Sequence, residues 1–170
     1  MVIKIGINGF GRIGRLVMRA AAENPDVSIV QINDPAGDPA TLAHLLQFDS
    51  VHGRSAHEAT AENDRIQFAN FNALVTQNKN IAETDWSACD VVIEASGKMK
   101  TKAMLQAYLD QGVKRVVVTA PVKEEGVLNV VMGVKHQAYN KSILRIVTAA
   151  SCTTNCLAPV VIVIHESLGL

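Results

Sequence analysis

Gly9-Phe10-Gly11-Arg12-Ile13-Gly14 is the stretch that decides the fold of this 170-residue chain. It fits the pattern G-x-G-x-x-G, it follows an apolar run over 2–8, and it opens a helical pattern over 11–24. A second apolar run over 27–33 ends beside Asp34, about 20 residues after the third glycine. Strand, glycine turn, helix and strand, in this order, predict the first βαβ unit of a parallel sheet.

Gly9, Gly11 and Gly14, together with Asp34, predict a dinucleotide site at this turn. One glycine allows the tight turn, one lets the backbone approach a pyrophosphate, and one lets the helix pack closely on the strand. The first N–H groups of the helix then face the phosphates. Asp34 can accept hydrogen bonds from ribose hydroxyls and would repel a 2′-phosphate, which favours NAD over NADP. The alternative is a glycine turn beside a surface Asp that caps a helix.

The rest of the chain continues to alternate strands and helices. Most apolar runs are rich in Val and Ile, as in strands buried on both faces of a parallel sheet. A polar, alternating stretch over 55–84 indicates a β-meander, and Gly112 stands where a helix C-terminus is expected. We therefore predict an α/β, Rossmann-type doubly wound, mostly parallel sheet with a β-meander insertion. The predicted strands are 2–8, 27–33, 91–95, 115–119, 128–133 and 144–149, and the predicted helices are 11–24, 39–48, 101–111 and one that begins near 152.

Small or polar residues close most of the predicted strands. In open α/β sheets, ligands bind outside the carboxyl ends of the strands, so these residues are candidate contacts. The alternative is that strands end in turns, and turns are polar for reasons of their own. The residues are Asn8, Asp34, Ser96, Gly97, Thr119, Ser151 and Cys152.

The stretch 149–156, Ala-Ala-Ser-Cys-Thr-Thr-Asn-Cys, follows the last predicted strand and leads into an apolar helix. Ser151 is a good N-cap and places Cys152 in the first turn, where the helix dipole and free N–H groups favour a thiolate. Cys152 is therefore a candidate nucleophile. Ser151, Thr153 and the first N–H groups can bind an oxyanion or a phosphate.

The remaining cysteines and the five histidines carry weaker signals. Cys89, beside a predicted strand, and Cys156, one turn into the last helix, are interpreted as small packing residues. Cys152 and Cys156, without further Cys or His at ligand spacing, predict no metal site. A thiolate usually works with a histidine base, but we interpret all five histidines as surface or capping residues. Pro159 predicts a kink in the last helix.

Composition excludes several classes of protein. Sixteen Lys and Arg balance sixteen Asp and Glu, so the formal net charge is zero, which argues against a basic face for nucleic acid. The longest late apolar run, 157–164, is too short to span a membrane, and the first residues do not fit a targeting signal. Three cysteines are too few for a disulfide framework. We expect a cytoplasmic protein with no nucleic-acid and no membrane partner.

Four stretches together resemble the phosphorylating glyceraldehyde-3-phosphate dehydrogenases. They are Asn-Gly-Phe-Gly-Arg-Ile-Gly-Arg at 8–15, Ile-Asn-Asp-Pro at 32–35, Phe-Asp-Ser-Val-His-Gly at 48–53 and Ser-Cys-Thr-Thr-Asn-Cys-Leu-Ala-Pro at 151–159. The resemblance covers the whole chain and the N-terminal half of the family. It implies an NAD-binding domain over 1–150 and a catalytic-cysteine helix over 151–170 that leads into a substrate domain.

The resemblance also implies a reaction and a role for single residues. Cys152 corresponds to the catalytic nucleophile, and Ser151 and Thr153 to groups that bind the substrate or inorganic phosphate. The implied reaction oxidises glyceraldehyde 3-phosphate with NAD through a cysteine thioester, which phosphate cleaves to an acyl phosphate. Members of the family are homotetramers. The implied NAD contacts are Arg12, Ile13, Asp34, Thr119 and, inside the meander, Lys79.

Several departures from the family leave alternatives open. Ala149 stands where Asn is usual and Met99 where an aromatic residue is usual, and Ser96 and Thr119 stand where Thr and Ser are common. The stretches 34–38 and 148–151 resemble a branch associated with arsenic resistance, in which arsenate would replace phosphate. An erythrose-4-phosphate-using relative is a further alternative. The family's catalytic His lies beyond residue 170, so the last alternative is an NAD-binding fragment without turnover that exposes apolar surface.

Overall fold

The computed structural model describes residues 2–169, and its elements follow the predicted order of strands and helices. Helices form at α1 (Arg12–Ala21), α2 (Pro39–Gln47), α3 (Lys102–Asp110) and α4 (Cys152–Leu168), with 3₁₀ turns at η1 (Ile81–Glu83) and η2 (His136–Ala138). The strands are β1 (Ile3–Asn8), β2 (Val27–Asn33), β3 (Phe48–Asp49), β4 (Gly53–Arg54), β5 (Ala59–Glu62), β6 (Arg65–Phe68), β7 (Phe71–Thr76), β8 (Val91–Glu94), β9 (Arg115–Val118), β10 (Leu128–Asn129) and β11 (Ile146–Thr148).

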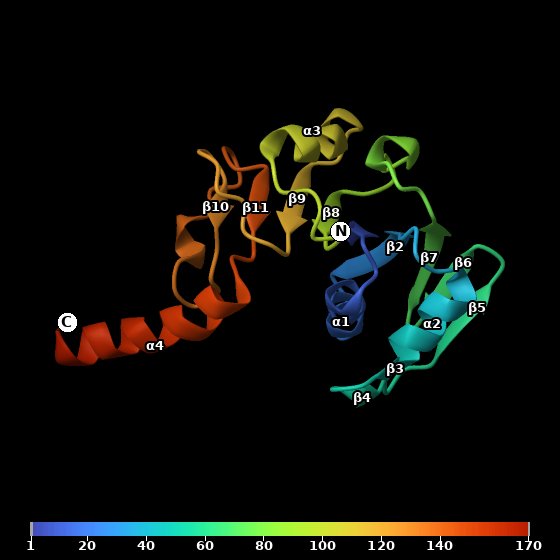
Figure 1. Cartoon of the computed structure of the whole chain (residues 1–170), viewed down its shortest axis with the longest axis horizontal. Coiled ribbons are helices and arrows are strands. Elements are labelled where there is room, and N and C mark those ends of the chain that lie inside the picture. Colours follow the sequence, from blue (N-terminus) through green and yellow to red (C-terminus); the bar gives the residue numbers. More distant parts are fainter. Residues whose placement is uncertain (1, 170) are drawn as a thin grey trace.

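Within residues 2–169, nine strands form one sheet in the order β10-β11-β9-β8-β1-β2-β7-β6-β5. Pairing is parallel from β10 to β7 and antiparallel from β7 through β6 to β5. The chain moves from β1 to β2 in one direction and from β8 to β9 in the other, so the strand order reverses between β1 and β8 (Figure 1). This reversal is the topological switch point of a doubly wound sheet, which confirms the predicted fold class.

The meander over 55–84 is confirmed in part. Strands β5, β6 and β7 form an antiparallel meander, and β7 also pairs in parallel with β2, which joins the meander to the main sheet. The end of the predicted stretch is the 3₁₀ turn η1 instead of a strand. A predicted strand over 128–133 shortens to β10, which pairs only with β11, and the chain turns away through Gly133 at φ +85°.

The hydrophobic core lies on opposite faces of the two parts of the sheet. One cluster packs Met18 of α1 and Leu46 of α2 against β1, β2, β6 and β7. Another packs Leu105 and Tyr108 of α3, with Trp86, against β8 and β9. Inward and outward residues alternate along β8 and β9, and the outward ones are only half-buried. The prediction of strands buried on both faces is therefore too strong for this part of the sheet.

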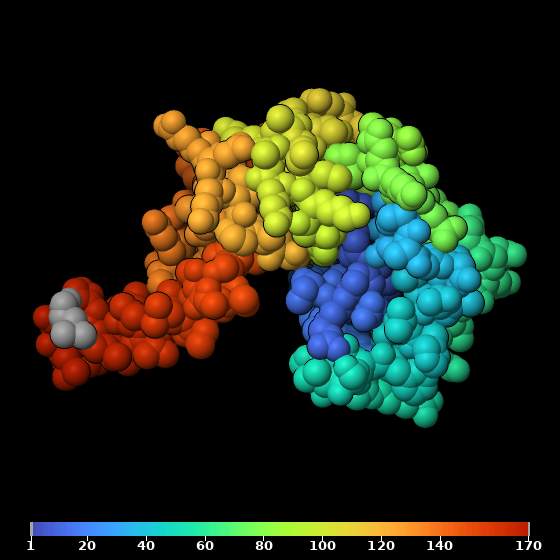
Figure 2. Space-filling view, in the orientation of Figure 1, coloured from blue at the N-terminus to red at the C-terminus, as the bar shows by residue number. Residues whose placement is uncertain are grey.

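Helix α4 leaves the sheet after β11 and extends away from the rest of the molecule as an arm (Figures 1 and 2). It begins at Cys152, runs through Pro159 without a break, and ends at Leu168, and none of these residues is buried. Leu157 is 63% exposed and Val163 60%. No helix among residues 2–169 is long and apolar enough to cross a membrane.

The three cysteines lie in different surroundings. Cys89 is buried beside Trp86, as predicted, and burial raises the pKa of its thiol to about 11. Cys156 is exposed, so its interpretation as a packing residue is wrong. The spacing placed it one turn into an apolar helix, but no other part of the described chain covers that helix. Cys152 is exposed in the first turn of α4.

Candidate functional site

A cleft opens where the carboxyl ends of β1, β2 and β8 meet, at the switch point of the sheet. Its volume is about 200 Å³. We call it the switch-point cleft. Five residues predicted for the dinucleotide site line it, together with main-chain and side-chain groups from the same turns. The five are Gly9, Gly11, Asp34, Lys79 and Ser96.

The glycines of the first turn differ in what a side chain would meet. Gly9 has φ +88°, a left-handed conformation that favours glycine, and a Cβ there would overlap the backbone of Ser96. A Cβ on Gly14 would overlap the carbonyl oxygen of Gly9. A Cβ on Gly11 would meet nothing within 4 Å. Gly9 and Gly14 are therefore required by the protein's own packing, whereas Gly11 keeps open the space that a pyrophosphate would enter.

The N-terminus of α1 is free to bind an anion. Gly11 is its N-cap and provides no side-chain cap, and the first turn contains no acidic residue. The Arg12 guanidinium is turned away to the β3–β4 hairpin, where Nε lies 3.3 Å from Asp49 Oδ2 and Nη2 donates to Ser50 Oγ at 2.7 Å. The side chain of Ile13 is 51% exposed. Arg12 and Ile13 can thus contribute their backbone N–H groups at this helix end.

Asp34 lies at the end of β2 as predicted, and its carboxylate is held in place by two backbone N–H groups. Phe10 donates to Oδ2 at 2.6 Å and Ala36 donates to Oδ1 at 2.8 Å. A carboxylate has about four acceptor positions, so capacity remains for ribose hydroxyls. Because the carboxylate is tied to the glycine turn itself, its position relative to the pyrophosphate space is fixed.

Two lysines place positive charge at the same cleft. Lys79 follows β7 and Lys98 follows β8, both are exposed, and neither makes an ion pair within the described chain. Sequence reasoning named Lys79 but missed Lys98, and it also missed Asn33 and Asn78, which line the cleft. Each missed residue is the direct neighbour of a predicted residue along the chain, and this adjacency is the signal that could have found it.

Five of the residues predicted for the dinucleotide site lie outside the lining of the cleft, and they are Arg12, Ile13 and Gly14 at the start of α1, Gly97 and Thr119. Gly97 has φ +71° in the exposed turn after β8. Thr119 follows β9, and its N–H donates to the carbonyl of Glu94 at 2.9 Å. The carboxyl ends of the parallel strands lie at one edge of the sheet, as predicted. The cleft occupies only part of that edge, so some strand ends lie outside it.

The cysteine turn is a second arrangement, at the start of α4. Ser151 is the N-cap, and its Oγ accepts from the Thr154 N–H at 3.1 Å and lies 3.0 Å from Thr153 Oγ1. Ala150 adopts φ +57°, which is strained for a residue with a side chain. Asn155 Nδ2 holds the turn by donating to the carbonyls of Ala149 at 2.6 Å and Ser151 at 2.9 Å.

The two arrangements are separate in the structure. None of the residues of α4 lines the switch-point cleft. His57 contacts Glu23 at 3.0 Å, and His136 accepts from the Gly133 N–H at 3.1 Å, so both have the surface roles predicted. Among residues 2–169, no group of three or more His, Cys, Asp or Glu could hold a metal ion.

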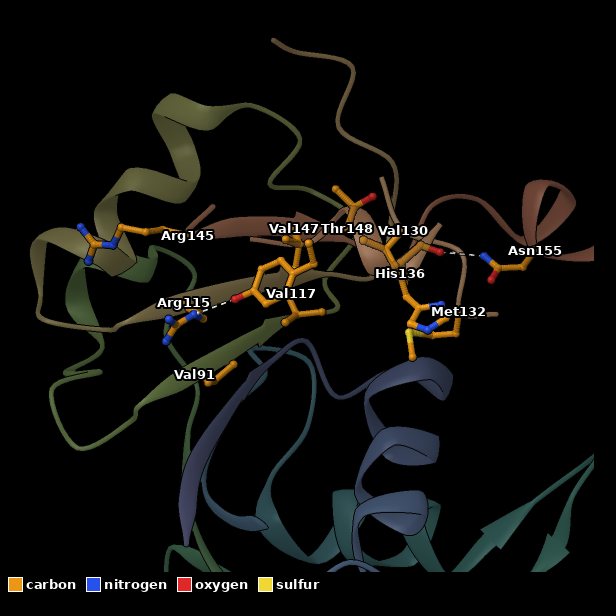
Figure 3. Close-up of a pocket in the computed structure, with 12 residues that line it drawn as sticks. Val91, Arg115, Val117, Val130, Met132, His136, Arg145, Val147, Thr148 and Asn155 are labelled. Carbon is orange, nitrogen blue, oxygen red and sulfur yellow. Dashed lines mark hydrogen bonds between the residues drawn. The ribbon is translucent and has the colours of Figure 1, made fainter. Parts of the chain in front are cut away.

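A larger pocket of about 520 Å³ lies on the half-covered face of β8, β9 and β11. Val91, Val117 and Val147 line it from these neighbouring strands, and Arg115 donates from its rim to the Tyr139 hydroxyl at 2.8 Å (Figure 3). It contains none of the residues that the sequence predicted for a site. Most of its lining surface is apolar, although Arg145 and Asn155 also line it, and none of its residues belongs to the glycine turn that would approach a pyrophosphate.

The fold and the cleft define the class of protein: an NAD-binding Rossmann domain of a dehydrogenase. A family model described as "Glyceraldehyde 3-phosphate dehydrogenase, NAD binding domain" matches residues 3–102, and the chain belongs to that family. The predicted family, fold class and cofactor NAD are thereby confirmed.

Curated relatives match the chain over its whole length. Glyceraldehyde-3-phosphate dehydrogenase 3 of a Nostoc species is 48% identical and glyceraldehyde-3-phosphate dehydrogenase of Geobacillus stearothermophilus is 40% identical, each over 100% of this chain and 51% of the relative. The cytosolic glyceraldehyde-3-phosphate dehydrogenase of Chondrus crispus is 43% identical over 98% of this chain and 50% of its own. The chain thus spans about half the length of the curated relatives it matches.

Proposed function

We propose that residues 1–150 bind NAD in the switch-point cleft and that residues 151–170 carry the reactive cysteine of a glyceraldehyde-3-phosphate dehydrogenase. The observation that carries the proposal is the glycine turn, where Gly11 leaves open space in front of the uncapped N-terminus of α1. Backbone N–H groups at this helix end would hold the pyrophosphate, and Asp34 would accept from the ribose hydroxyls. Lys79 and Lys98 would offset the phosphate charge.

In this proposal Cys152 carries out the covalent chemistry. Its Sγ attacks the carbonyl carbon of an aldehyde phosphate, and NAD, when bound, supplies the hydride acceptor. The cysteine then holds the substrate as a thioester. An oxygen of inorganic phosphate attacks the thioester carbon, and the Cys152 thiolate leaves with release of an acyl phosphate. Ser151, Thr153 and the first N–H groups of α4 would bind the substrate oxyanion or the attacking phosphate.

Titration calorimetry tests the binding half of the proposal. Wild-type protein should bind NAD and should bind NADP at least about tenfold more weakly, because the Asp34 carboxylate repels a 2′-phosphate. Asp34→Ala should reduce this preference, whereas Asp64→Ala, an exposed acid in the meander, should leave it unchanged. Equal affinity of the wild type for the two dinucleotides would contradict the assignment of Asp34.

Binding of NAD without turnover is the second candidate, because Cys152 lies on a helix that does not line the cleft. Formation of NADH from glyceraldehyde 3-phosphate, with phosphate or with arsenate, separates the candidates. Turnover that is lost in Cys152→Ser supports the enzyme. Erythrose 4-phosphate in place of the substrate tests the related specificity, and light scattering of the same samples tests the homotetramer.

A further inference from the structure

Three buried polar side chains, two of which line the switch-point cleft, form a continuous chain of hydrogen bonds at its base. Asn33 at the end of β2, Asn8 at the end of β1 and Glu94 at the end of β8 are 1%, 4% and 1% exposed. Asn33 Nδ2 donates to Asn8 Oδ1 at 2.8 Å, and Asn8 Nδ2 donates to Glu94 Oε2 at 2.8 Å. These hydrogen bonds therefore connect β2, β1 and β8, the three strands whose ends form the cleft.

All bonds along this chain run in one direction. Asn33 Oδ1 accepts from the Thr76 hydroxyl at 2.8 Å and from the Asn78 N–H at 2.9 Å. The Nδ2 group of each asparagine therefore donates toward β8, and Glu94 is the last acceptor. A reversed amide at Asn8 would set its NH₂ group against that of Asn33. The Asn78 N–H fixes this orientation at one end, and the orientation requires an acceptor at position 94 at the other.

Glu94 is also the acceptor for the turn that borders the cleft. Its Oε1 accepts from the backbone N–H of Ser96 at 2.8 Å and from the Ser96 hydroxyl at 2.5 Å. The Tyr108 hydroxyl donates to Oε2 at 2.5 Å from α3. Within residues 2–169 Glu94 makes no ion pair, so hydrogen-bond donors alone compensate its burial.

The turn that Glu94 holds is the wall against which the glycine turn packs. A Cβ on Gly9 would overlap the backbone of Ser96, and the Ala95 N–H donates to the carbonyl of Asn8 at 2.7 Å. A shift of the Ser96 turn would therefore move Gly9 or open a gap beside it. Gly9 and Ser96 both line the cleft, so a bound dinucleotide would contact both residues.

We propose that Glu94 is a positioning residue for dinucleotide binding, which acts by fixing the Ser96 turn against Gly9 and by accepting from the Asn8 amide. The proposal rests on the proposed binding of NAD in this cleft. Glu94 is not among the residues that line the cleft, so it would act on the dinucleotide through them. Both of its carboxylate oxygens must accept, because the Ser96 backbone N–H at Oε1 and the Asn8 amide N–H at Oε2 can only donate.

Glu94→Gln and Tyr108→Phe form a matched pair that tests it. Glu94→Gln keeps the volume but places an NH₂ group against Ser96 or against Asn8 and Tyr108. Tyr108→Phe removes one donor from the same carboxylate, on the α3 side, and Tyr108 does not line the cleft. Calorimetry with NAD and with AMP measures affinity, and Trp86 fluorescence in urea shows that each variant is folded under the conditions of binding.

We expect Glu94→Gln to bind NAD and AMP at least about tenfold more weakly, and Tyr108→Phe to stay within about twofold of the wild type. Equal losses in the two folded variants would reduce Glu94 to a structural role and overturn the proposal, as would unchanged affinity in Glu94→Gln. If Glu94→Gln does not fold, Glu94→Asp replaces it, keeps the charge and withdraws the acceptor from Ser96. Its affinity should fall by several-fold, and an unchanged value would overturn the proposal. Failure of the wild type to bind NAD would instead refute the proposed function.

Discussion

Helix α1 follows β1 and helix α4 follows β11, so both begin at the carboxyl ends of parallel strands in one sheet. Helix α1 buries Gly14 and Met18 against the sheet and leaves its first turn without a side-chain cap. Helix α4 buries no residue, and Ser151 caps its first turn. The position of α1 is thus set by packing, whereas the start of α4 is set by hydrogen bonds within a few residues.

This difference shows which part of the proposed site is already rigid. The turn before α1 is fixed by contacts from β2 and β8, through Asp34 and Ser96. The turn before α4 is fixed by Asn155 and by the Thr148 hydroxyl, which accepts from the Ala150 N–H at 3.0 Å. The cleft should therefore bind its ligand without rearrangement, while Cys152 has a defined local geometry on a helix that no described residue covers.

Substitution of Gly14 should have the largest effect, because it disrupts the packing of α1 against the glycine turn. The Cβ of Gly14→Ala would overlap the Gly9 carbonyl oxygen, and backbone must shift to relieve it. We expect a loss of about 1–3 kcal/mol in the free energy of unfolding, measured in urea by Trp86 fluorescence, and loss of NAD binding.

Gly11→Ala is the control in the same turn, because its Cβ would meet no protein atom. Its free energy of unfolding should stay within about 0.5 kcal/mol of the wild type, while NAD affinity falls. Similar stability losses in the two variants would show that the turn is sensitive throughout and that the contact of Gly14 is not special.

The next largest effect should be the loss of stability at alkaline pH. It should come from the core of the sheet and not from α4. Burial raises the pKa of Cys89 from 9.0 to about 11, so the folded protein keeps its proton where the unfolded chain releases it. The contribution of this thiol to the free energy of unfolding is fully present below pH 9. It is lost as the pH rises to about 11, by no more than about 3 kcal/mol.

Cys89→Ala should flatten this part of the stability profile, although it leaves a small cavity and lowers the plateau. Cys156→Ala, an exposed thiol on α4, should leave the profile unchanged. Identical profiles in the wild type and Cys89→Ala would assign the alkaline loss to other groups, of which Tyr108 is one, since burial also raises its pKa.

Removal of the α4 cap should have a smaller, local effect. Ser151→Ala should cost about 1 kcal/mol of helix stability, visible as lost helical circular dichroism, without moving the urea midpoint of Trp86 fluorescence. Alkylation of Cys152 should slow relative to Cys156, which lies on the same helix and serves as the internal reference. A shifted fluorescence midpoint would show that α4 is coupled to the core after all.

The smallest effect is expected from Arg12, whose guanidinium pairs with the β3–β4 hairpin. Arg12→Gln should change the free energy of unfolding by less than about 1 kcal/mol, because the Arg12 side chain is half-exposed and Asp49 keeps the hydrogen bonds from the Val51 and His52 N–H groups. NAD affinity should stay within about threefold if the backbone N–H provides the contact. A loss of tenfold or more would show that the guanidinium leaves Asp49 to bind the ligand.

Local signals predicted the first βαβ unit well, because strand, glycine turn and helix are adjacent along the chain. The predicted strand 27–33 is observed with the same bounds, and the predicted helix 39–48 differs by one residue. Asp34 and Gly9 reach the cleft for the same reason. The predicted strand over 128–133 is longer than the observed β10, because an apolar run does not show how many neighbouring strands it will pair with.

The errors concern residues whose surroundings come from distant segments. An apolar helical pattern around Cys156 predicts burial only if another element packs against it, and the pattern cannot supply that element. Glu94 looks like an ordinary polar strand end, and its proposed role depends on Asn8 and Gly9, which the topology brings beside β8. Asn33 has no signal of its own beside Asp34 in the sequence, and only the structure shows that its side chain is buried, at 1% exposed.

The placement of β8 beside β1 has a consequence in time. Asn8 and its acceptor Glu94 are 86 residues apart in the chain. At about 5–20 residues per second, synthesis separates them by roughly 4–17 seconds. Strands β1 and β2 can pair during that interval. The Asn8 amide then still lacks its acceptor Glu94, and the Ser96 turn that packs against Gly9 is not yet present. A nascent chain should therefore acquire its glycine turn early and its ability to hold a nucleotide only after β8 has emerged.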